Sequence, residues 1–238
     1  AHALRALGRE RRASLFMVLL AAFDALVFRL TGQSDLAIGT PVAGRDLPES
    51  EALIGFFVNT LVLRTQVLGH EPFIALLERV RAVALDAYAH QDLPFERLVR
   101  ELNPERDPSR HPLVQTVFAV QNTPAHALAL AGLEVRALPG FDESTRMDLE
   151  LHVRDDPGAS GGLLLDLVFN VDLFDPWRMR ALLDQLRQVL DSVAHDPTCP
   201  IEALPLLTDA ARDELLERER LHDVVVAAEG ETADPVGG

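Results

Sequence analysis

Side chains that could act as nucleophiles, bases or metal ligands are few in this sequence and poorly grouped. The eight histidines, among them His90, His111 and His152, never fall at metal-ligand spacing on one helix face, so no zinc site is predicted. Residues 39–44 lack the Lys-Ser/Thr pair of a nucleotide loop, and no Gly-x-Ser-x-Gly elbow occurs. Cys199 lies between two prolines, where nothing nearby would lower the pKa of its thiol. The residue types alone therefore predict no catalytic residue and no metal site.

A polar pair inside an apolar run is the first sign of a specific role. Residues 54–60 have the sequence Ile-Gly-Phe-Phe-Val-Asn-Thr, which places the amide of Asn59 and the hydroxyl of Thr60 in an apolar strand. A buried polar group costs free energy unless it finds a hydrogen-bond partner. Two interpretations of Asn59 remain open: its side chain bridges to adjacent backbone, or it faces a ligand channel.

Two further segments combine charge with turn residues. Residues 90–96, His-Gln-Asp-Leu-Pro-Phe-Glu, join two predicted helices, and the dipole of the second helix favours the carboxylates of Asp92 and Glu96 at its start. Residues 106–113, Arg-Asp-Pro-Ser-Arg-His-Pro-Leu, mix opposite charges with a turn that leads into a strand. A salt-bridged corner explains this segment structurally, and a functional role is the alternative.

The spacing of apolar residues predicts an α/β fold in which a mixed sheet is flanked by helices. Helices are expected at 14–30, 72–89, 94–102 and 176–194, with Ser14 capping the first and Trp177 facing inward on the last. Strands are expected at 36–42, 54–63, 113–121, 133–138, 146–153 and 163–171. The Phe- and Val-rich run 54–63 is typical of an inner strand. From residue 209 a charged helix is expected, followed by a disordered tail.

Composition and charge exclude some classes of partner. The chain has 238 residues, 37 acidic and 22 basic, and its formal net charge of -15 repels phosphate backbones and anionic lipid surfaces. Neither a nucleic-acid partner nor a membrane partner is therefore predicted. A single cysteine fits a reducing compartment, and the first twelve residues do not resemble a signal peptide. These features predict a cytoplasmic location.

The three polar segments, taken in order, resemble three late motifs of nonribosomal peptide synthetase condensation domains. Those motifs are I-G-x-F-V-N-T, H-Q-D-x-P-F-E and R-D-x-S-R-x-P-L, and the chain matches each at nearly every position. Residues 38–45, 147–149 and 173–175 are also similar to the family, and the likeness extends from residue 15 to about 207. It implies that residues 1–207 form the C-terminal lobe of a two-lobed, chloramphenicol acetyltransferase-like fold. Residues 208–238 would then be a charged helix and a linker remnant.

The resemblance also implies a reaction and its partners. In the family, two carrier proteins present phosphopantetheine thioesters in the cleft between the lobes, and the acceptor amine attacks the donor thioester to form an amide. The family's H-H-x-x-x-D-G motif lies on the N-terminal lobe, and no two histidines are adjacent here. The resemblance therefore implies that the chain is inactive without an N-terminal lobe and binds no cofactor of its own. The alternatives are a noncatalytic lobe that docks carrier proteins or scaffolds a synthetase, and part of an ester-forming acyltransferase of the same fold.

Residue roles follow from the matched motif positions alone. Substrate-channel positions are expected at Gly55, Asn59, Thr60 and Asp148. Positions that order the lobe or face a carrier protein are expected at Gln91, Asp92, Pro94, Arg106, Asp107 and Arg110.

Overall fold

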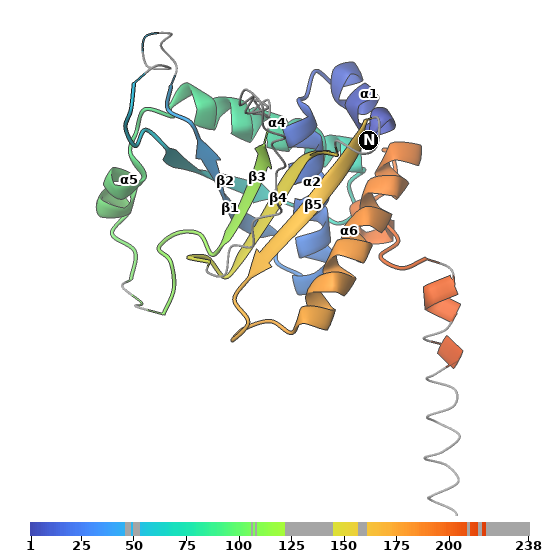
Figure 1. Ribbon diagram of the computed structural model, residues 1–238. Coiled ribbons are helices and arrows are strands. Elements are labelled where there is room, and N and C mark those ends of the chain that lie inside the picture. Colours follow the sequence, from blue (N-terminus) through green and yellow to red (C-terminus); the bar gives the residue numbers. More distant parts are fainter. Residues whose placement is uncertain are drawn as a thin grey trace, which may run out of the picture.

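A computed structural model describes residues 1–45, 49, 53–105, 107, 109–121, 145–156, 161–208, 210–213 and 216–217 (Figure 1). Its helices are α1 (His2–Glu10), α2 (Leu15–Thr31), α4 (Phe73–Ala89), α5 (Phe95–Leu102), α6 (Pro176–His195) and the short 3-10 helix η1 (Ile201–Ala203). Its strands are β1 (Asp35–Val42), β2 (Asn59–Gln66), β3 (Thr116–Gln121), β4 (Leu149–Asp156) and β5 (Gly162–Phe169).

The strands form one mixed sheet in the order β2-β1-β3-β4-β5. The central strand β3 is parallel to both β1 and β4, while the outer pairs β1/β2 and β4/β5 are antiparallel. Residues alternate between the two faces, so Leu149, Leu151 and Val153 of β4 join the core while Glu150 and His152 lie on the other face. The prediction of an α/β chain with a mixed sheet and flanking helices is confirmed.

Helix α2 is the centre of the core: it lies between the helices α4 and α6 and packs against β3, while α4 and α6 contact the sheet at β2 and β5 (Figure 1). The Ser14 hydroxyl accepts a hydrogen bond from the Met17 N–H (3.2 Å) at its start, and Gly32 ends it in the left-handed region with φ 73°. Phe23 stacks on Phe118 of β3 with a ring separation of 5.8 Å. The predicted helix at 14–30, its cap and its stop are confirmed.

The other helices largely match the sequence-based expectations. Helices α4, α5 and α6 begin and end within one residue of the predicted limits. Helix α1 was not predicted, because the segment is rich in charged residues and contains few apolar ones. Its apolar residues Leu4 and Leu7 nevertheless pack into the core. The guanidinium of Arg29 on α2 donates to the carbonyls of Ile201 and Leu204, which fastens η1 against the core.

Two expectations about burial are wrong. The predicted inner strand 54–63 begins only at Asn59 and lies at the edge of the sheet, while Ile54 and Phe56 are 105% and 90% exposed. The apolar run therefore continues from a surface loop into the strand. Trp177 does not face inward but is 61% exposed, because it lies in the first turn of α6, before the buried positions Met179 and Leu186.

The predicted strand 133–138 and most of the tail after residue 209 lie outside the described residues, although 210–213 and 216–217 contain helical residues. Within the described part, no single helix has the length and hydropathy to cross a membrane. Helices α1 and α2 meet those criteria only as a pair, with a bend of 103° between them.

Candidate functional site

Asn59 connects the first two motif segments. Its Nδ2 donates to the carbonyls of Gln91 (2.8 Å) and Leu93 (2.9 Å), and its Oδ1 accepts from the N–H groups of Thr60 (2.9 Å) and Phe95 (3.0 Å). All four hydrogen-bonding positions of the amide are therefore used. The side chain bridges to backbone, as the first of the two interpretations holds, but three of its partners lie more than thirty residues along the chain.

The 90–96 segment forms the turn that begins α5. Pro94 precedes the helix in an extended conformation, and its carbonyl accepts from the Arg97 N–H (3.0 Å) and the Leu98 N–H (3.1 Å). Asp92 is exposed in the turn. Asn103 ends the helix with φ 41°, in the left-handed region. Because the Asn59 side chain is hydrogen-bonded to the backbone of this turn, it also fixes the direction of α5 relative to the sheet.

The third segment is a corner held by Asp107. Its Oδ1 accepts from the N–H (2.9 Å) and the hydroxyl (2.6 Å) of Ser109, and these bonds hold the pKa of the Asp107 carboxyl below its usual value. The Arg110 Nε lies 3.7 Å from Asp107 Oδ2, which is an exposed ion pair of small energetic value. Arg106 lies outside the described residues.

Ring and amide contacts join this corner to α5 and to the sheet. The Phe95 ring lies 5.4 Å from the His111 ring, and Gln115 Nε2 donates to the His111 carbonyl (3.0 Å). The Gln115 carbonyl in turn accepts from the Asp148 N–H (3.0 Å), at the start of β4. Asn59, the turn 90–96, the corner 107–113 and Gln115 are called the motif cluster below. Gln115 and the pairing of Phe95 with His111 were not predicted, since a lone glutamine before a strand carries no sequence signal.

The backbone of the corner is strained at Leu113. Its φ is 67°, and the Val114 N–H donates to the Pro112 carbonyl (2.8 Å), which closes a three-residue turn. Turns of this kind with positive φ are rare and cost free energy for a residue with a side chain. The corner therefore holds Leu113 in a backbone conformation that costs free energy.

A groove of about 1220 Å³ lies between α5 and the corner. One wall carries Glu96, Val99 and Arg100 of α5, and the other carries Asp107, Arg110, His111 and Gln115. Both signs of charge line it. No residue of α5 is fully buried, so the helix stands beside the sheet (Figure 1).

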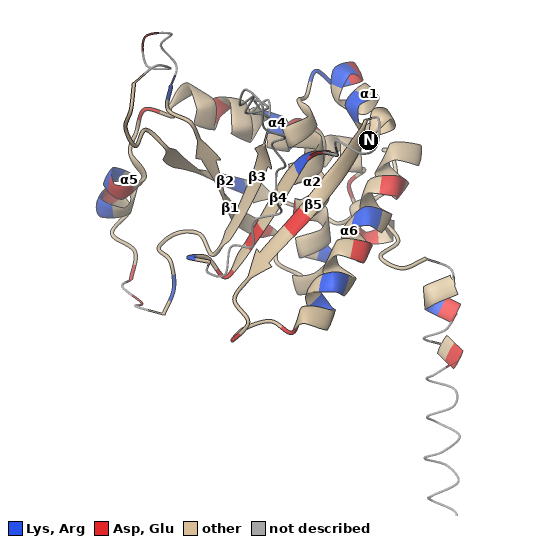
Figure 2. Ribbon diagram, in the orientation of Figure 1, with Lys and Arg blue, Asp and Glu red and all other residues tan. Residues whose placement is uncertain are grey.

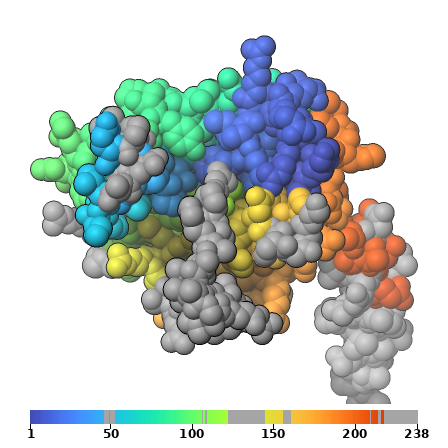
Figure 3. All heavy atoms as spheres, turned by 45° about the horizontal axis from the view of Figure 1, so that its top comes forward, coloured from blue at the N-terminus to red at the C-terminus, as the bar shows by residue number. Residues whose placement is uncertain are grey.

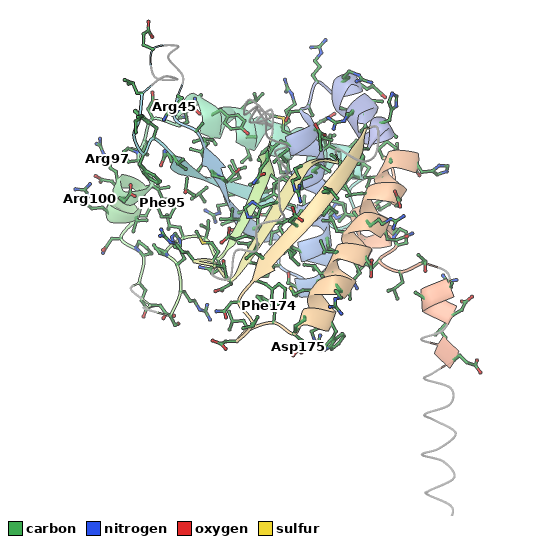
Figure 4. The ribbon with its side chains drawn as sticks, in the orientation of Figure 1. Arg45, Phe95, Arg97, Arg100, Phe174 and Asp175 are labelled. Atoms are coloured by element: carbon green, nitrogen blue, oxygen red, sulfur yellow. The ribbon has the colours of Figure 1, made fainter. Side chains whose placement is uncertain are left out.

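The exposed cations of α5 lie on the far side from the sheet. Figure 4 shows Arg97 and Arg100 pointing away from the molecule, while Phe95 lies on the side toward the sheet. Figure 2 shows both signs of charge on α5, because Glu96 and Glu101 accompany these two arginines.

Gly55 lies in the exposed loop that precedes β2, and its carbonyl accepts a hydrogen bond from the Arg45 guanidinium (3.5 Å). Figure 3 shows this part of the chain, in light blue, at the surface of the molecule. In that loop the Arg45 guanidinium lies 4.4 Å from the centre of the Phe57 ring. Gly44 has φ 62°, and a Cβ there would lie 2.1 Å from the Phe57 carbonyl oxygen. The loop thus folds back on residues 44–45 at a contact that only glycine permits.

Of the predicted substrate-channel positions, Asn59 belongs to the motif cluster. Thr60 adjoins it through its N–H bond to Asn59 and Asp148 through Gln115, whereas Gly55 lies apart. Of the predicted lobe-ordering positions, Gln91, Pro94, Asp107 and Arg110 lie at the turn or the groove. Among the described residues, no group of three or more His, Cys, Asp or Glu side chains is placed to hold a metal ion.

Comparison with known proteins places the chain in a family. The family model described as "Condensation domain" matches residues 1–216. A linear gramicidin synthase of Brevibacillus parabrevis is 44% identical over 216 residues, which are 90% of this chain and 3% of the relative. Phosphinothricin tripeptide synthetase PhsB of Streptomyces viridochromogenes is 41% identical over 217 residues, or 90% of this chain and 18% of the relative. The chain thus spans a small part of these relatives.

Solved structures give the same result. The X-domain from teicoplanin biosynthesis has a TM-score of 0.78 and 28% identity, with 86% of this chain and 47% of that chain covered. The condensation domain from the monacolin K polyketide synthase MokA has a TM-score of 0.76 and 26% identity, with 84% and 46% covered. The mixed sheet, its helices and the motif cluster define a domain of the condensation type. The chain belongs to the condensation domain family of the nonribosomal peptide synthetases.

Proposed function

We propose that this chain is the C-terminal lobe of a condensation domain that joins a carrier-bound acyl or peptidyl donor to a carrier-bound aminoacyl acceptor. The acceptor nitrogen attacks the donor thioester carbon, a C–N bond forms and the C–S bond breaks. The proton lost by the nitrogen ends on the departing sulfur, which leaves as the free thiol of the donor carrier. The observation that carries the proposal is the motif cluster, in which Asn59 binds the turn 90–96 and Phe95 contacts the corner. The match to slightly less than half of the condensation domain of MokA supports the assignment to one lobe.

Within this proposal, the described residues shape the cleft and perform no bond-breaking step. The Asn59 amide is fully engaged with backbone, so its role is to hold the channel wall and not to bind substrate. Thr60 pairs with Pro41 at the start of β2, and Asp148 joins the ends of β3 and β5 through its backbone. Gly55 contributes the loop that approaches the other lobe.

Joining the chain to an N-terminal lobe that bears H-H-x-x-x-D-G tests this function. Mass spectrometry would follow the acceptor carrier protein after mixing with a loaded donor carrier. The expected result is an amide product with the joined lobes and none with the chain alone. Product from the chain alone, or no product when the joined protein is folded and both carriers are loaded, would contradict the proposal.

The groove and the outer face of α5 are the proposed carrier-facing surface. Arg97 and Arg100 are exposed, and Leu98 and Val99 are half-buried on a helix that has no fully buried residue. An acidic helical carrier protein could pair with the cations and cover the apolar positions, with Arg110 at the groove beyond them.

A charge-reversal pair tests the docking surface. Arg97→Glu with Arg100→Glu is expected to weaken binding of a phosphopantetheinylated carrier protein by at least about tenfold. Each substitution replaces an attraction to the acidic carrier protein with a repulsion. Arg180→Glu with Arg187→Glu on α6 makes the same change in net charge on another exposed helix face. Equal effects of the two pairs would show a nonspecific charge effect and remove α5 from the interface.

A noncatalytic docking lobe is the second candidate, because the X-domain that this chain resembles has been solved in complex with another protein, OxyB. That structure has a TM-score of 0.76 and 28% identity, with 87% of this chain covered. Partner binding without amide formation in the joined protein would favour this candidate. Formation of an ester in place of an amide would instead favour an acyltransferase of the same fold.

A further inference from the structure

Asp24 is a charged residue type at the centre of the core. It lies in the middle of α2 and is 0% exposed, among the neighbours Leu20, Phe23 and Leu26. Among the described residues, the only other buried polar side chains are Thr40 and Thr65. A buried carboxylate without a compensating charge is costly, so the chemical state of Asp24 needs an explanation.

Thr65 of β2 is the polar neighbour of Asp24. Neither the oxygens of the Asp24 carboxyl nor the Thr65 hydroxyl form a hydrogen bond of ordinary length and angle. Burial raises the pKa of Asp24 to about 8, and the nearby Thr65 hydroxyl opposes this shift.

We propose that Asp24 carries a proton in the folded chain, so that the packing of the core around α2 is coupled to proton binding. A neutral carboxyl avoids the cost of an isolated charge in an apolar core, where the Asp24 oxygens have no hydrogen-bond partner among the described residues.

Charged side chains on the surrounding elements do not provide a partner for Asp24. Arg29 on α2 binds the carbonyls of η1, and Arg79 on α4 binds the Gln66 carbonyl and Glu71. Arg81 on α4 donates to the Arg12 carbonyl. On the remaining neighbours, the ion pairs are Arg5 with Asp155, Arg11 with Glu10, Arg178 with Asp175 and Arg187 with Asp191. Strand β3 has no titratable residue.

The test is urea denaturation of the 238-residue chain as a function of pH, with Asp24→Asn beside it. Because the folded state holds the proton more tightly than the unfolded state, stability is greatest at low pH and falls as pH rises toward about 8. Relative to Asp24→Asn, the folded-to-unfolded ratio is expected to fall about tenfold per pH unit between about pH 5 and about pH 8.

Carbon-13 titration of the Asp24 carboxyl in the unaltered chain gives a direct readout that requires no variant to fold. Asp184→Asn, on the exposed face of α6, is the matched control and should leave the pH dependence unchanged. Thr65→Val should move the Asp24 titration to higher pH, because a hydroxyl stabilises a carboxylate more than an acid. An Asp24 midpoint near the ordinary aspartate pKa of about 3.9, or parallel stability curves for the chain and Asp24→Asn, would overturn the proposal.

Discussion

At the scale of single residues, Asn59 combines the most contacts of functional interest in one side chain. It donates to two carbonyls of the turn 90–96 and accepts from two N–H groups, one of them at the start of α5. Replacing its Nδ2 by oxygen would place a charged acceptor against the Gln91 and Leu93 carbonyls. The direction of α5 therefore depends on an amide, and a carboxylate cannot substitute for it.

Asn59→Asp is accordingly expected to destabilise the chain more than Asn59→Ala, which should cost about 2 kcal/mol of unfolding free energy. Urea denaturation measures both. Hydrogen exchange distinguishes the two variants. In Asn59→Ala the Phe95 amide loses its acceptor and should exchange faster, whereas in Asn59→Asp it keeps an acceptor. Thr60→Ser keeps the backbone bond to Asn59 and is the control. An aspartate variant as stable as the original chain would contradict the assigned bonds.

Asp107 gives a second prediction at this scale. Its pKa is lowered chiefly by hydrogen bonds from Ser109, so the corner gains stability above the ordinary aspartate pKa and loses it as pH falls through the lowered value. Ser109→Ala should raise the Asp107 midpoint toward the ordinary range in a carbon-13 titration. The reference value is the ordinary aspartate pKa of about 3.9. An unchanged midpoint would mean that Ser109 is not the cause.

The sequence could show that Asn59 needs a partner but not which one. An amide within an apolar run indicates that the amide has hydrogen-bond partners. The identity of those partners, residues 91–95, depends on the path of the chain through the intervening helix α4. The strain at Leu113 had no signal either, because leucine is not a residue type that favours positive φ.

At the scale of elements, the loop between β1 and β2 depends on close backbone contact. Gly44 and Gly32 both have positive φ, 62° and 73°, but only Gly44 has a neighbour in the way of a side chain. The nearest atom to a Cβ at Gly44 is the Phe57 carbonyl oxygen at 2.1 Å, whereas Gly32 has nothing within 4 Å. Alanine substitutions at these two glycines therefore distinguish the cost of backbone strain from the cost of steric overlap.

Gly32→Ala is expected to cost about 1 kcal/mol, from strain alone. Gly44→Ala should cost roughly 3 kcal/mol, because the loop must also move. Urea denaturation gives the two values, and limited proteolysis should detect faster cleavage within 53–58 only for Gly44→Ala. Equal costs would show that the loop can rearrange freely and that its fold-back contact is weak.

Elements with their own local signals were predicted well. Ser14 and Gly32 delimit α2, and Asn103 ends α5, because caps and stops depend on a few neighbouring residues. Strand β2 was misplaced because its apolar residues continue into a loop, and apolar content alone does not distinguish the two. Whether a strand lies at an edge depends on its pairing with distant strands.

At the scale of the whole molecule, several large apolar side chains among the described residues remain at the surface, and two places hold groups of them. Ile54 and Phe56 lie in the loop before β2, and Val171, Leu173 and Trp177 lie around the start of α6. Exposed apolar groups of this size mark surfaces that bind other molecules. Both places are candidates for contact with the remainder of a condensation domain.

Trp177 is the only tryptophan, so intrinsic tryptophan fluorescence reports on the second place alone. With 61% of its surface exposed, its emission in the folded chain should resemble that of the unfolded chain and be readily quenched by acrylamide. On joining the chain to an N-terminal lobe, protection from acrylamide would indicate burial there. Strong protection in the chain alone would contradict the exposed position.

The family and fold class were available from the sequence because three motifs in a fixed order specify a whole topology. The groove and the exposed patches were not, since they depend on how far α5 stands from the sheet and on which face of α6 meets it. Trp177 illustrates the limit: its size predicts burial, and its position in the first turn overrides that prediction.

The contact between Arg29 and η1 has a consequence for synthesis of the chain. Helix α2 leaves the ribosome before Ile201 and Leu204, which complete its packing, accept bonds from Arg29 and follow about 170 residues later. At roughly 5–20 residues per second, part of the surface of α2 waits for roughly ten to thirty seconds without these partners. A chaperone that covers this surface during translation would protect it until η1 emerges.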